Sequence, residues 1–559
     1  MLNRFLTRRS CLLCMVLTTT ALSGSGTPAL AQDCHAPYEM VTTLYHPDPG
    51  SYSVWDSVEG QPRVDERYVS ALPMDDGGVL AVGTRKAQGA ATMELLFVRL
   101  DKRGRNLWDK SYSVDGLSGV VKMVPRGDEV LVLGNATVHE ADKGHAQIYL
   151  GFYKRDGSKI KEKFIDANGV DLTARDFLLS DDEQKIIIAV TEEKKSPEQG
   201  GGVMTKSGAL YFLDAGGDKI GDRSFVMGHD SAFESISLWK NNRNETGYIA
   251  TGWFENDYKK RIGWVLKLRG DGGLVWQREF DRGLGAEIPV SAAYGDESVL
   301  AFGEVLPADS GSIGAWLMML SLADGSVRWQ RYYHGETGHH DYRPRGLMVN
   351  KDGLISALMQ AKVDAAKVGA VKTGAGKDSG GRDAMHGDIR VPEMMDYVHV
   401  LNIDPRGVTL SGDAYFYGVG AQAMQITVGP HQERLIAGYT RTEDGEIADI
   451  VEKIGQDDAE AKTAKGAEAV PNLPDAPMPE GTMKGLEMLR KHLEDGGHDA
   501  GHEKQPESDE SKKAATMGEA AQKTAKTDGY SDDGWIVMGT ALDTYQDPCK
   551  KPVRTSIDQ

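Results

Sequence analysis

Short apolar runs of about five residues, each bounded by polar turns, recur along most of this chain. The clearest unit covers 247–280 and contains three of them, beginning at Tyr248, Gly263 and Leu274. The runs are rich in β-branched and aromatic residues and partly alternate with polar ones, which favours short strands. Between the second and third runs, RGDGG at 269–273 supplies glycines for a tight turn. The unit therefore predicts strands joined by a polar loop and then a tight turn.

The same order of elements recurs, so the chain contains internal repeats. Two further good copies cover 78–108 and 298–329, and weaker ones begin at Val130, Ile187, Leu354 and Leu435. Another short run precedes each copy, as at 69–72, which makes four strands per repeat of about 50 to 60 residues. A four-stranded sheet cannot bury both faces alone, whereas sheets packed around a ring can. We therefore expect an all-β fold, a β-propeller.

The number of blades follows from the repeat boundaries. Full repeats are predicted at 68–114, 117–167, 171–228, 231–283, 285–336 and 339–418, and a partial one begins at Ala421. Residues 32–66 resemble the end of a blade, and 534–539 resemble the strand at 247–252. A closing blade shared between the two ends of the chain gives seven blades; counting 534–539 separately gives eight. Seven is preferred because no convincing strands lie between 456 and 528.

The ends of the chain read differently from the repeats. Residues 1–31 are expected to be a signal peptide, with TRRSCLL at 7–13 and the small residues ALA at 29–31. This is a twin-arginine pattern, although an ordinary secretory signal is the alternative. The propeller is assigned to 32–455, a low-complexity and mostly disordered insertion to 456–528, and a closing strand and tail to 529–559. We expect a periplasmic or secreted protein.

The insertion and the overall charge limit the classes of partner. Residues 456–527 contain no Phe, Tyr, Trp, Ile or Cys, so they cannot bury enough apolar surface to order themselves. The net charge of −19 becomes −22 when the signal peptide, with its three arginines and no acids, is removed. Such acidity argues against nucleic acid as a partner. No later stretch approaches the roughly 20 apolar residues of a membrane span.

Two cysteines, Cys34 and Cys549, remain after removal of the signal peptide. They lie near opposite ends of the chain, and a closed ring brings its ends to one blade. In a compartment that permits disulfides, a Cys34–Cys549 bridge is expected, with two unpaired thiols as the alternative.

Sequence variation concentrates on one side of the predicted ring. The turns between the third and fourth strands are tight and alike, whereas the long segments follow the strand that ends in Gly: 84–92, 135–146, 192–208, 253–262, 304–314 and 361–396. In the usual blade order these segments share one face with the links between blades. Loops on a rigid scaffold commonly carry function, so we expect a binding site on this long-loop face.

The turn-plus-Trp elements carry a family resemblance. The motifs DGSVRW at 324–329, DGGLVW at 271–276 and KRGRNLW at 102–108 resemble the tryptophan-docking repeat of pyrroloquinoline-quinone-type propellers. The resemblance covers about 68–454 and implies that Trp108, Trp276 and Trp329 pack between blades. That broad group contains quinone-dependent dehydrogenases and non-catalytic scaffolds of the cell envelope. The adjacent cysteine pair of the enzymes has no counterpart here.

One link segment gathers candidate ligands. In HGETGHHDYRPRG at 334–346, His334, His339, His340 and Asp341 suit a divalent transition metal, and Arg343 and Arg345 suit an anionic ligand. A polar loop with surface histidines is the alternative. A second tract, His492, His498 and His502 among acidic residues, could bind metal loosely.

No nucleophile elbow, zinc-protease, phosphate-loop or haem motif occurs in the sequence. The preferred hypothesis is a non-catalytic binding or scaffold propeller that engages a protein, peptide or glycan through its long-loop face, with no cofactor. The alternative is a metal- or quinone-dependent periplasmic oxidoreductase.

Overall fold

A computed structural model of the chain describes 37–43, 53–61, 63–140, 143–195, 204–306, 312–335, 341–364, 394–415, 420–429, 432–443 and 530–539. These ranges belong to one compact unit, Ala36–Tyr545. The predicted signal peptide, the two cysteines, the predicted insertion at 456–528 and the second histidine tract all lie outside the described residues.

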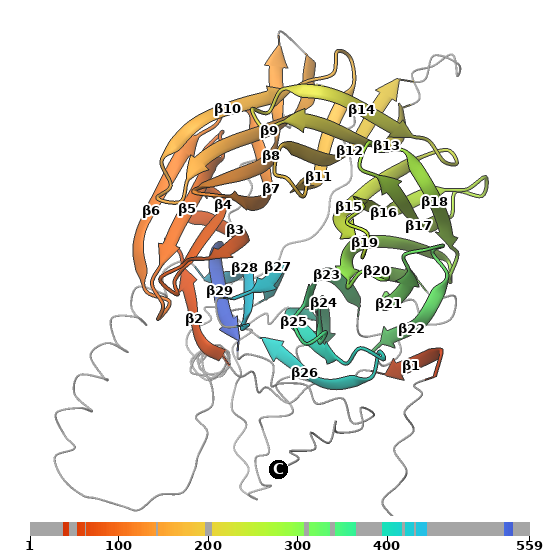
Figure 1. The fold of residues 1–559 in the computed structure, drawn as a ribbon. Coiled ribbons are helices and arrows are strands. Elements are labelled where there is room, and N and C mark those ends of the chain that lie inside the picture. Colours follow the sequence, from red (N-terminus) through yellow and green to blue (C-terminus); the bar gives the residue numbers. More distant parts are fainter. Residues whose placement is uncertain are drawn as a thin grey trace, which may run out of the picture. The chain divides into compact units, whose positions relative to one another are not determined.

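The unit is a seven-bladed β-propeller, which confirms the predicted fold class and the preferred blade count. Six blades are built in chain order from four strands each (Figure 1). The strands are β3 (Val64–Pro73), β4 (Val79–Ala87), β5 (Glu94–Leu100) and β6 (Asn106–Ser113) in blade 1; β7 (Leu117–Arg126), β8 (Glu129–Glu140), β9 (Lys143–Lys154) and β10 (Lys159–Ile165) in blade 2; β11 (Asp171–Leu179), β12 (Lys185–Lys195), β13 (Met204–Asp214) and β14 (Lys219–Phe225) in blade 3; β15 (Ser231–Lys240), β16 (Thr246–Glu255), β17 (Arg261–Arg269) and β18 (Leu274–Phe280) in blade 4; β19 (Gly285–Tyr294), β20 (Ser298–Leu306), β21 (Gly314–Ser321) and β22 (Val327–His334) in blade 5; and β23 (Tyr342–Val349), β24 (Ile355–Asp364), β25 (Met394–Ile403) and β26 (Thr409–Tyr415) in blade 6.

Blade 7 closes the ring with strands from both ends of the chain. It orders β27 (Ala421–Val428), β28 (Arg434–Glu443), β29 (Tyr530–Gly539) and β2 (Ser53–Glu59). The equivalence between 534–539 and 247–252 is wrong, because β29 takes the third position in its sheet, where blade 4 has β17. A GW pair occurs in both β16 and β17, so the motif alone did not distinguish the two positions.

One strand was not predicted. The short β1 (Glu39–Thr43) pairs in parallel with the outermost strand of blade 5, β22. Its five residues carry no turn signal and no regular alternation. Strand β1 is instead held by tertiary contacts, among them the buried Arg331, whose guanidinium donates to the carbonyls of Pro37 and Tyr38 at 3.1 and 3.3 Å.

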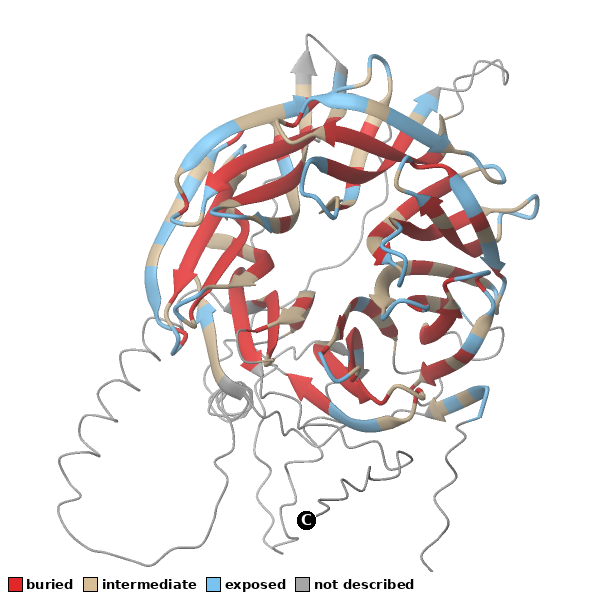
Figure 2. Ribbon diagram, viewed as in Figure 1, coloured by how far each residue is buried: buried red, intermediate tan, exposed pale blue. Residues whose placement is uncertain are grey.

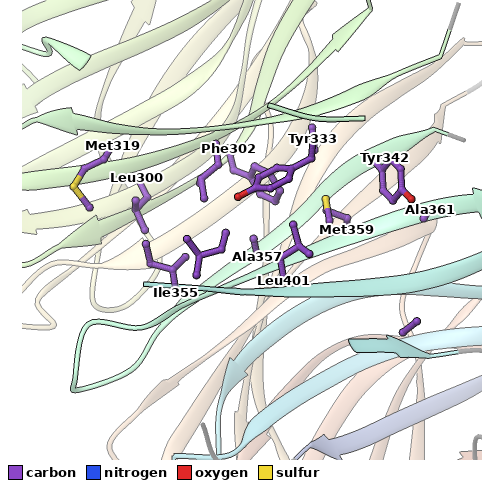
Figure 3. Packing of buried hydrophobic residues seen from close by; sticks show 14 of the residues in the cluster. Leu300, Phe302, Met319, Tyr333, Tyr342, Ile355, Ala357, Met359, Ala361 and Leu401 are labelled. Atoms are coloured by element: carbon purple, nitrogen blue, oxygen red, sulfur yellow. The ribbon is translucent and has the colours of Figure 1, made fainter. Parts of the chain in front are cut away.

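The hydrophobic core is divided among the interfaces of the ring. Each of seven buried clusters joins two neighbouring blades, and Figure 3 shows the one between blades 5 and 6, where Leu300 and Phe302 meet Ile355 and Met359. Middle strands such as β21 are buried along nearly their whole length, whereas outer strands such as β14 are mostly exposed (Figure 2). Apolar runs without strict alternation are therefore explained by sheets covered on both faces.

The two faces of the ring differ in their connections. First-to-second and third-to-fourth turns lie on one face, the tight-turn face; second-to-third loops and interblade links lie on the other. Several predicted long loops are partly strand: 135–146 is mostly a hairpin in which β8 and β9 continue to Glu140 and Lys143. Polar residues dominate these extensions, so a hydrophobic pattern could not reveal them. In the described ranges no helix is long and apolar enough to cross a membrane.

Every innermost strand carries a β-bulge at an equivalent place. The register skips one residue or two there, and the bulged residues are Val69, Val121, Arg175, Glu234, Pro289, Arg345 and Met424. A bulge turns the next side chain toward the neighbouring blade. In this way Ser70 Oγ accepts from Met123 N at 3.1 Å, and Asp176 Oδ2 accepts from Ile236 N at 2.9 Å.

Candidate functional site

An aspartate four residues before the bulge joins neighbouring blades in four places. Its Oδ1 accepts from a backbone N–H at or just before the third strand of the preceding blade, at 2.8 to 3.1 Å. The four pairs are Asp65 with Asp532 N, Asp171 with Ala146 N, Asp230 with Lys206 N, and Asp341 with Ile313 N. This set was not predicted, because the aspartates lie at different distances from the predicted starts of the repeats and align only through the bulges.

The link between blades 5 and 6 is thereby placed on the long-loop face, but the predicted metal ligands are only partly described. Asp341 uses one oxygen for the interblade bond, and its other oxygen lies 3.7 Å from Arg343. His334 ends β22, where its Nδ1 lies 2.8 Å from Gly335 O. His339 and His340 lie outside the described residues. Within the described ranges no three His, Cys, Asp or Glu residues are grouped closely enough to hold a metal ion.

The structure places Arg343 and Arg345 on β23, beside two glutamates that the sequence analysis did not single out. Glu287 of β19 and Glu304 of β20 stand directly opposite one another in the sheet of blade 5. Arg343 Nη1 lies 3.2 Å from Glu304 Oε1, and Arg261 Nη1 lies 2.7 Å from Glu287 Oε2. We call Glu287 and Glu304 the acid pair.

The acid pair is an exception within the repeat. In the other six blades the equivalent opposed residues include no two like charges: Arg67 with Thr84, Gly119 with Asn135, Thr173 with Thr191, Ala232 with Trp253, Arg343 with Gln360, and Gln422 with Tyr439. Like charges directly opposite one another destabilise a sheet. The fold therefore does not require these two acids. Glu304, Thr84 and Trp253 each follow the glycine of the second strand in their repeats. An alignment of the repeats at this position would have shown that Glu304 is an acid where the other two blades have uncharged residues.

The electrostatics of the acid pair are unusual for a protein surface. Burial, the charge of Glu287 and a hydrogen bond between the two carboxyl groups raise the pKa of Glu304 to about 7, although Arg343 and Arg345 oppose the shift. Glu304 therefore exchanges a proton near neutral pH, as two close carboxylates often do.

The charged cluster continues into blades 4 and 3. The Arg261 guanidinium lies over the Trp253 ring, 4.1 Å from its centroid, and Trp253 Nε1 donates to Glu234 Oε1 at 3.1 Å. Glu234 lies 3.7 Å from Arg175, and burial is the main cause of its raised pKa. Arg175, Glu234 and Arg345 are the three charged members of the bulge series, so the cluster follows the inner strands of blades 3 to 6.

The arrangement can bind anions through its arginines and can exchange a proton at Glu304.

The three tryptophans of the repeat each contact the third-to-fourth turn of the next blade. Trp276 Nε1 donates to Leu322 O at 3.1 Å, and Trp329 Nε1 donates to Pro405 O at 3.2 Å. A Cβ atom built on Gly157 would lie 2.9 Å from the Trp108 ring. Each Trp thus occupies the space that the turn glycine leaves.

Comparisons with known proteins give no family. No protein-family model and no curated protein matches the chain. Among solved structures, an apocarotenoid oxygenase mutant from Synechocystis is 14% identical, covering 50% of this chain and 63% of its own, with a TM-score of 0.31. An α-L-arabinanase from Penicillium chrysogenum complexed with arabinobiose is 11% identical, covering 56% and 94%, with a TM-score of 0.36. A protein of unknown function from Dyadobacter fermentans is 10% identical, covering 56% and 95%, with a TM-score of 0.34. The chain thus spans less than two thirds of the oxygenase, and scores this low say nothing about its activity.

Proposed function

We propose that this protein is a non-catalytic binding or scaffold propeller, exported to the periplasm or beyond, that engages a protein, peptide or glycan through its long-loop face. The main support is a set of exposed apolar side chains on this face. Val226, Tyr258, Leu284 and Leu306 are exposed on the loops, links and strand ends of this face, with Tyr258 at 90%. Most of the other exposed large apolar side chains of the described ranges lie on outer strands, several of them, such as Leu274, at the strand end next to a tight turn.

These four side chains belong to connected segments of blades 3 to 5. His229 in the link after Val226 lies 3.5 Å from Asp257, next to Tyr258. Lys260 on the same loop pairs with Asp281 in the following link. Leu284 N then donates to Leu306 O at 2.5 Å. Exposed apolar side chains among charged groups are typical of an interaction site.

Photo-crosslinking in the cell that makes the protein tests the proposed face. A photoreactive residue replaces Tyr258, and the matched control replaces Asn242, in the first-to-second turn of the same blade. The proposal expects a discrete partner adduct from position 258 and none from 242. Adducts from 242 alone, or equal adducts from both positions, would reject the long-loop face.

The alternative function is a metal- or quinone-dependent oxidoreductase, favoured by the twin-arginine pattern and by the histidines of 334–341. Twin-arginine export carries folded proteins, often with their cofactor. Metal analysis and an absorption spectrum of protein purified from its native compartment discriminate the two functions. Stoichiometric metal or a quinone band that disappears in the His339→Ala, His340→Ala double variant would favour the oxidoreductase.

We also propose that the repeat is related to the pyrroloquinoline-quinone-type propellers. The contacts of Trp108, Trp276 and Trp329 with the turns of the next blade support this relationship. The Cys34–Cys549 bridge remains a prediction for the closed ring. Non-reducing mass spectrometry tests it, and two alkylatable thiols in the native protein would exclude it.

A further inference from the structure

We propose that Arg345, with Arg343 beside it, binds a carboxylate group of the partner. Glu304 takes up a proton from solvent when this carboxylate binds, and the incoming carboxylate replaces it as the partner of the arginines. The inference rests on the proposed binding function and specifies the chemistry that one part of the long-loop face recognises.

Arg345 is a cation with unused donors. It is the bulged residue of β23, its side chain is exposed, and no hydrogen bond or ion pair joins its guanidinium to another described residue. Yet Glu304, Tyr439 and Asp396 stand close enough to affect it, and desolvation by the surrounding protein lowers its pKa. A partly desolvated guanidinium with five free donors is a ready site for an anion.

The charges around Glu304 balance when it is ionised, and one positive charge is in excess when it carries a proton. When Glu304 is protonated, Arg261 pairs with Glu287, and Arg343 has Asp341 as its charged neighbour at 3.7 Å. The remaining positive charge belongs to Arg345. When Glu304 is ionised it supplies the balancing negative charge itself, held 3.2 Å from Arg343. Glu304 therefore occupies, in its ionised form, the electrostatic position that an external anion would take.

The other charged groups around the site are paired or oppose one another. Glu234 of β15 faces Arg175 of β11 and also lies within electrostatic range of Glu287 and Arg261. On the opposite side, Asp396 of β25 interacts with Lys362 of β24 and with Arg345. Burial is the main cause of the raised pKa of Asp396, and the charges of Lys362 and Arg345 oppose this shift. The net excess of charge at the site is thus set by Glu304.

A carboxylate fits this site better than a phosphate does. Guanidinium groups bind both anions through paired hydrogen bonds. Here only one positive charge is in excess, with Asp396 near Arg345, Asp341 3.7 Å from Arg343 and Glu287 beside Glu304. A dianion would be repelled by these acids, whereas a monoanion would balance the site.

The direction of the pH dependence follows from the exchange of one carboxylate for another. Ligand binding releases Arg343 from Glu304, so Glu304 is more readily protonated in the complex than in the free protein. By reciprocity, protonation of Glu304 strengthens binding. Affinity should therefore rise as pH falls through about 7, the pKa of Glu304, and because one proton is linked the change from pH 8 to pH 6 is about tenfold.

Calorimetric titration of the purified full chain with two carboxylates tests the inference. The probes are glucuronate, which represents an acidic sugar, and N-acetylalanine, which represents a peptide C-terminus. Their neutral amides are the controls, and inorganic phosphate is the competing anion. We expect at least one carboxylate to bind about tenfold more tightly at pH 6 than at pH 8, and which one binds identifies the source of the group. Equal binding of the amides, tighter binding of phosphate, or binding that does not change with pH would overturn the proposal.

Two variants separate the roles of the residues. Glu304→Gln should bind the probe at both pH values about as tightly as the parent does at pH 6. Arg345→Gln should weaken binding at pH 6 by more than about tenfold, and Arg345→Lys should restore part of the loss. A folded Arg345→Gln protein that binds normally would overturn the assignment. If the probes fail while position 258 still crosslinks a partner, only this inference fails; the loss of both would reject the binding function as well.

Discussion

At the scale of residues, equivalent positions of the seven blades separate what the fold needs from what it does not. The aspartate before the bulge forms the same interblade bond in four blades. The opposed pair after the Gly-terminated strand is different, because only blade 5 places two acids there. Because its interblade bond recurs in four blades, Asp341 has a scaffold role. Because the other blades lack an acid pair at the equivalent place, Glu287 and Glu304 are candidates for function.

The scaffold role of Asp341 predicts how it responds to substitution. Asp341→Asn keeps an oxygen that can accept from Ile313 N, so the free energy of unfolding should change by less than about 1 kcal/mol. Asp341→Ala leaves the N–H without its acceptor and should cost about 1.5 to 3 kcal/mol. Urea denaturation measures both, with Asp171→Ala in blade 3 as the matched control. An Asn variant that is as damaged as the Ala variant would contradict this role.

The raised pKa of Glu304 predicts a pH-dependent stability. The folded protein holds the proton more tightly than the unfolded chain, whose ordinary value is 4.5. This contribution is therefore fully present below about pH 4.5 and is lost as the pH rises to about 7. Its size is on the order of 3 kcal/mol. Glu304→Gln should remove this part of the dependence, so that the difference in unfolding free energy between variant and parent grows from pH 5 to pH 8. A constant difference would exclude the shift.

At the scale of elements, the sequence predicts the strands of the blades well and their ends poorly. Buried second and third strands were found because their apolar runs lie between turn residues, as in 247–280. The polar extensions of β8 and β9, and the short β1, carry no such signal and were missed. The acid pair was missed for a related reason, since Glu287 and Glu304 are 17 positions apart and meet only through strand register.

Contact between a turn glycine and the Trp of the preceding blade predicts a measurable cost. Gly325 has a φ of 73° and would place a Cβ atom 2.9 Å from the Trp276 ring. Gly89 has a similar φ of 80° but nothing within 4 Å. Both Gly→Ala variants should lose about 1 to 2 kcal/mol from the backbone. Gly325→Ala should lose a further 1 to 3 kcal/mol, roughly, from overpacking. Equal losses in thermal or urea unfolding would show that the Trp contact contributes nothing.

At the scale of the whole molecule, the ring is closed by hydrogen bonds between distant parts of the chain. Strand β29 pairs with β28 on one side and with β2 on the other. The repeat pattern was sufficient to predict this closure, because one half-blade stood at each end of the repeats. It was not sufficient to predict a partner, since recognition on the long-loop face depends on side chains that the fold brings together from several blades.

Closure predicts the outcome of limited proteolysis. The composition of 456–527 favours early cleavage there. The C-terminal fragment should nevertheless remain bound, because β29 lies between two strands of blade 7 and Trp535 is fully buried. The nicked protein should elute as one species by size exclusion and separate only in denaturant. Fragments that separate in native buffer would contradict the closure, and a resistant segment would mean that it packs on the ring.

The central claim, that partners bind the long-loop face, is tested most directly by hydrogen exchange of the protein alone and in a complex rebuilt with its crosslinked partner. We predict slower exchange at 226–230, 256–260 and 281–284, together with unchanged exchange in the tight turns at 241–245 and 270–273 of the same region. Protection confined to those tight turns or to the outer strands would contradict the account.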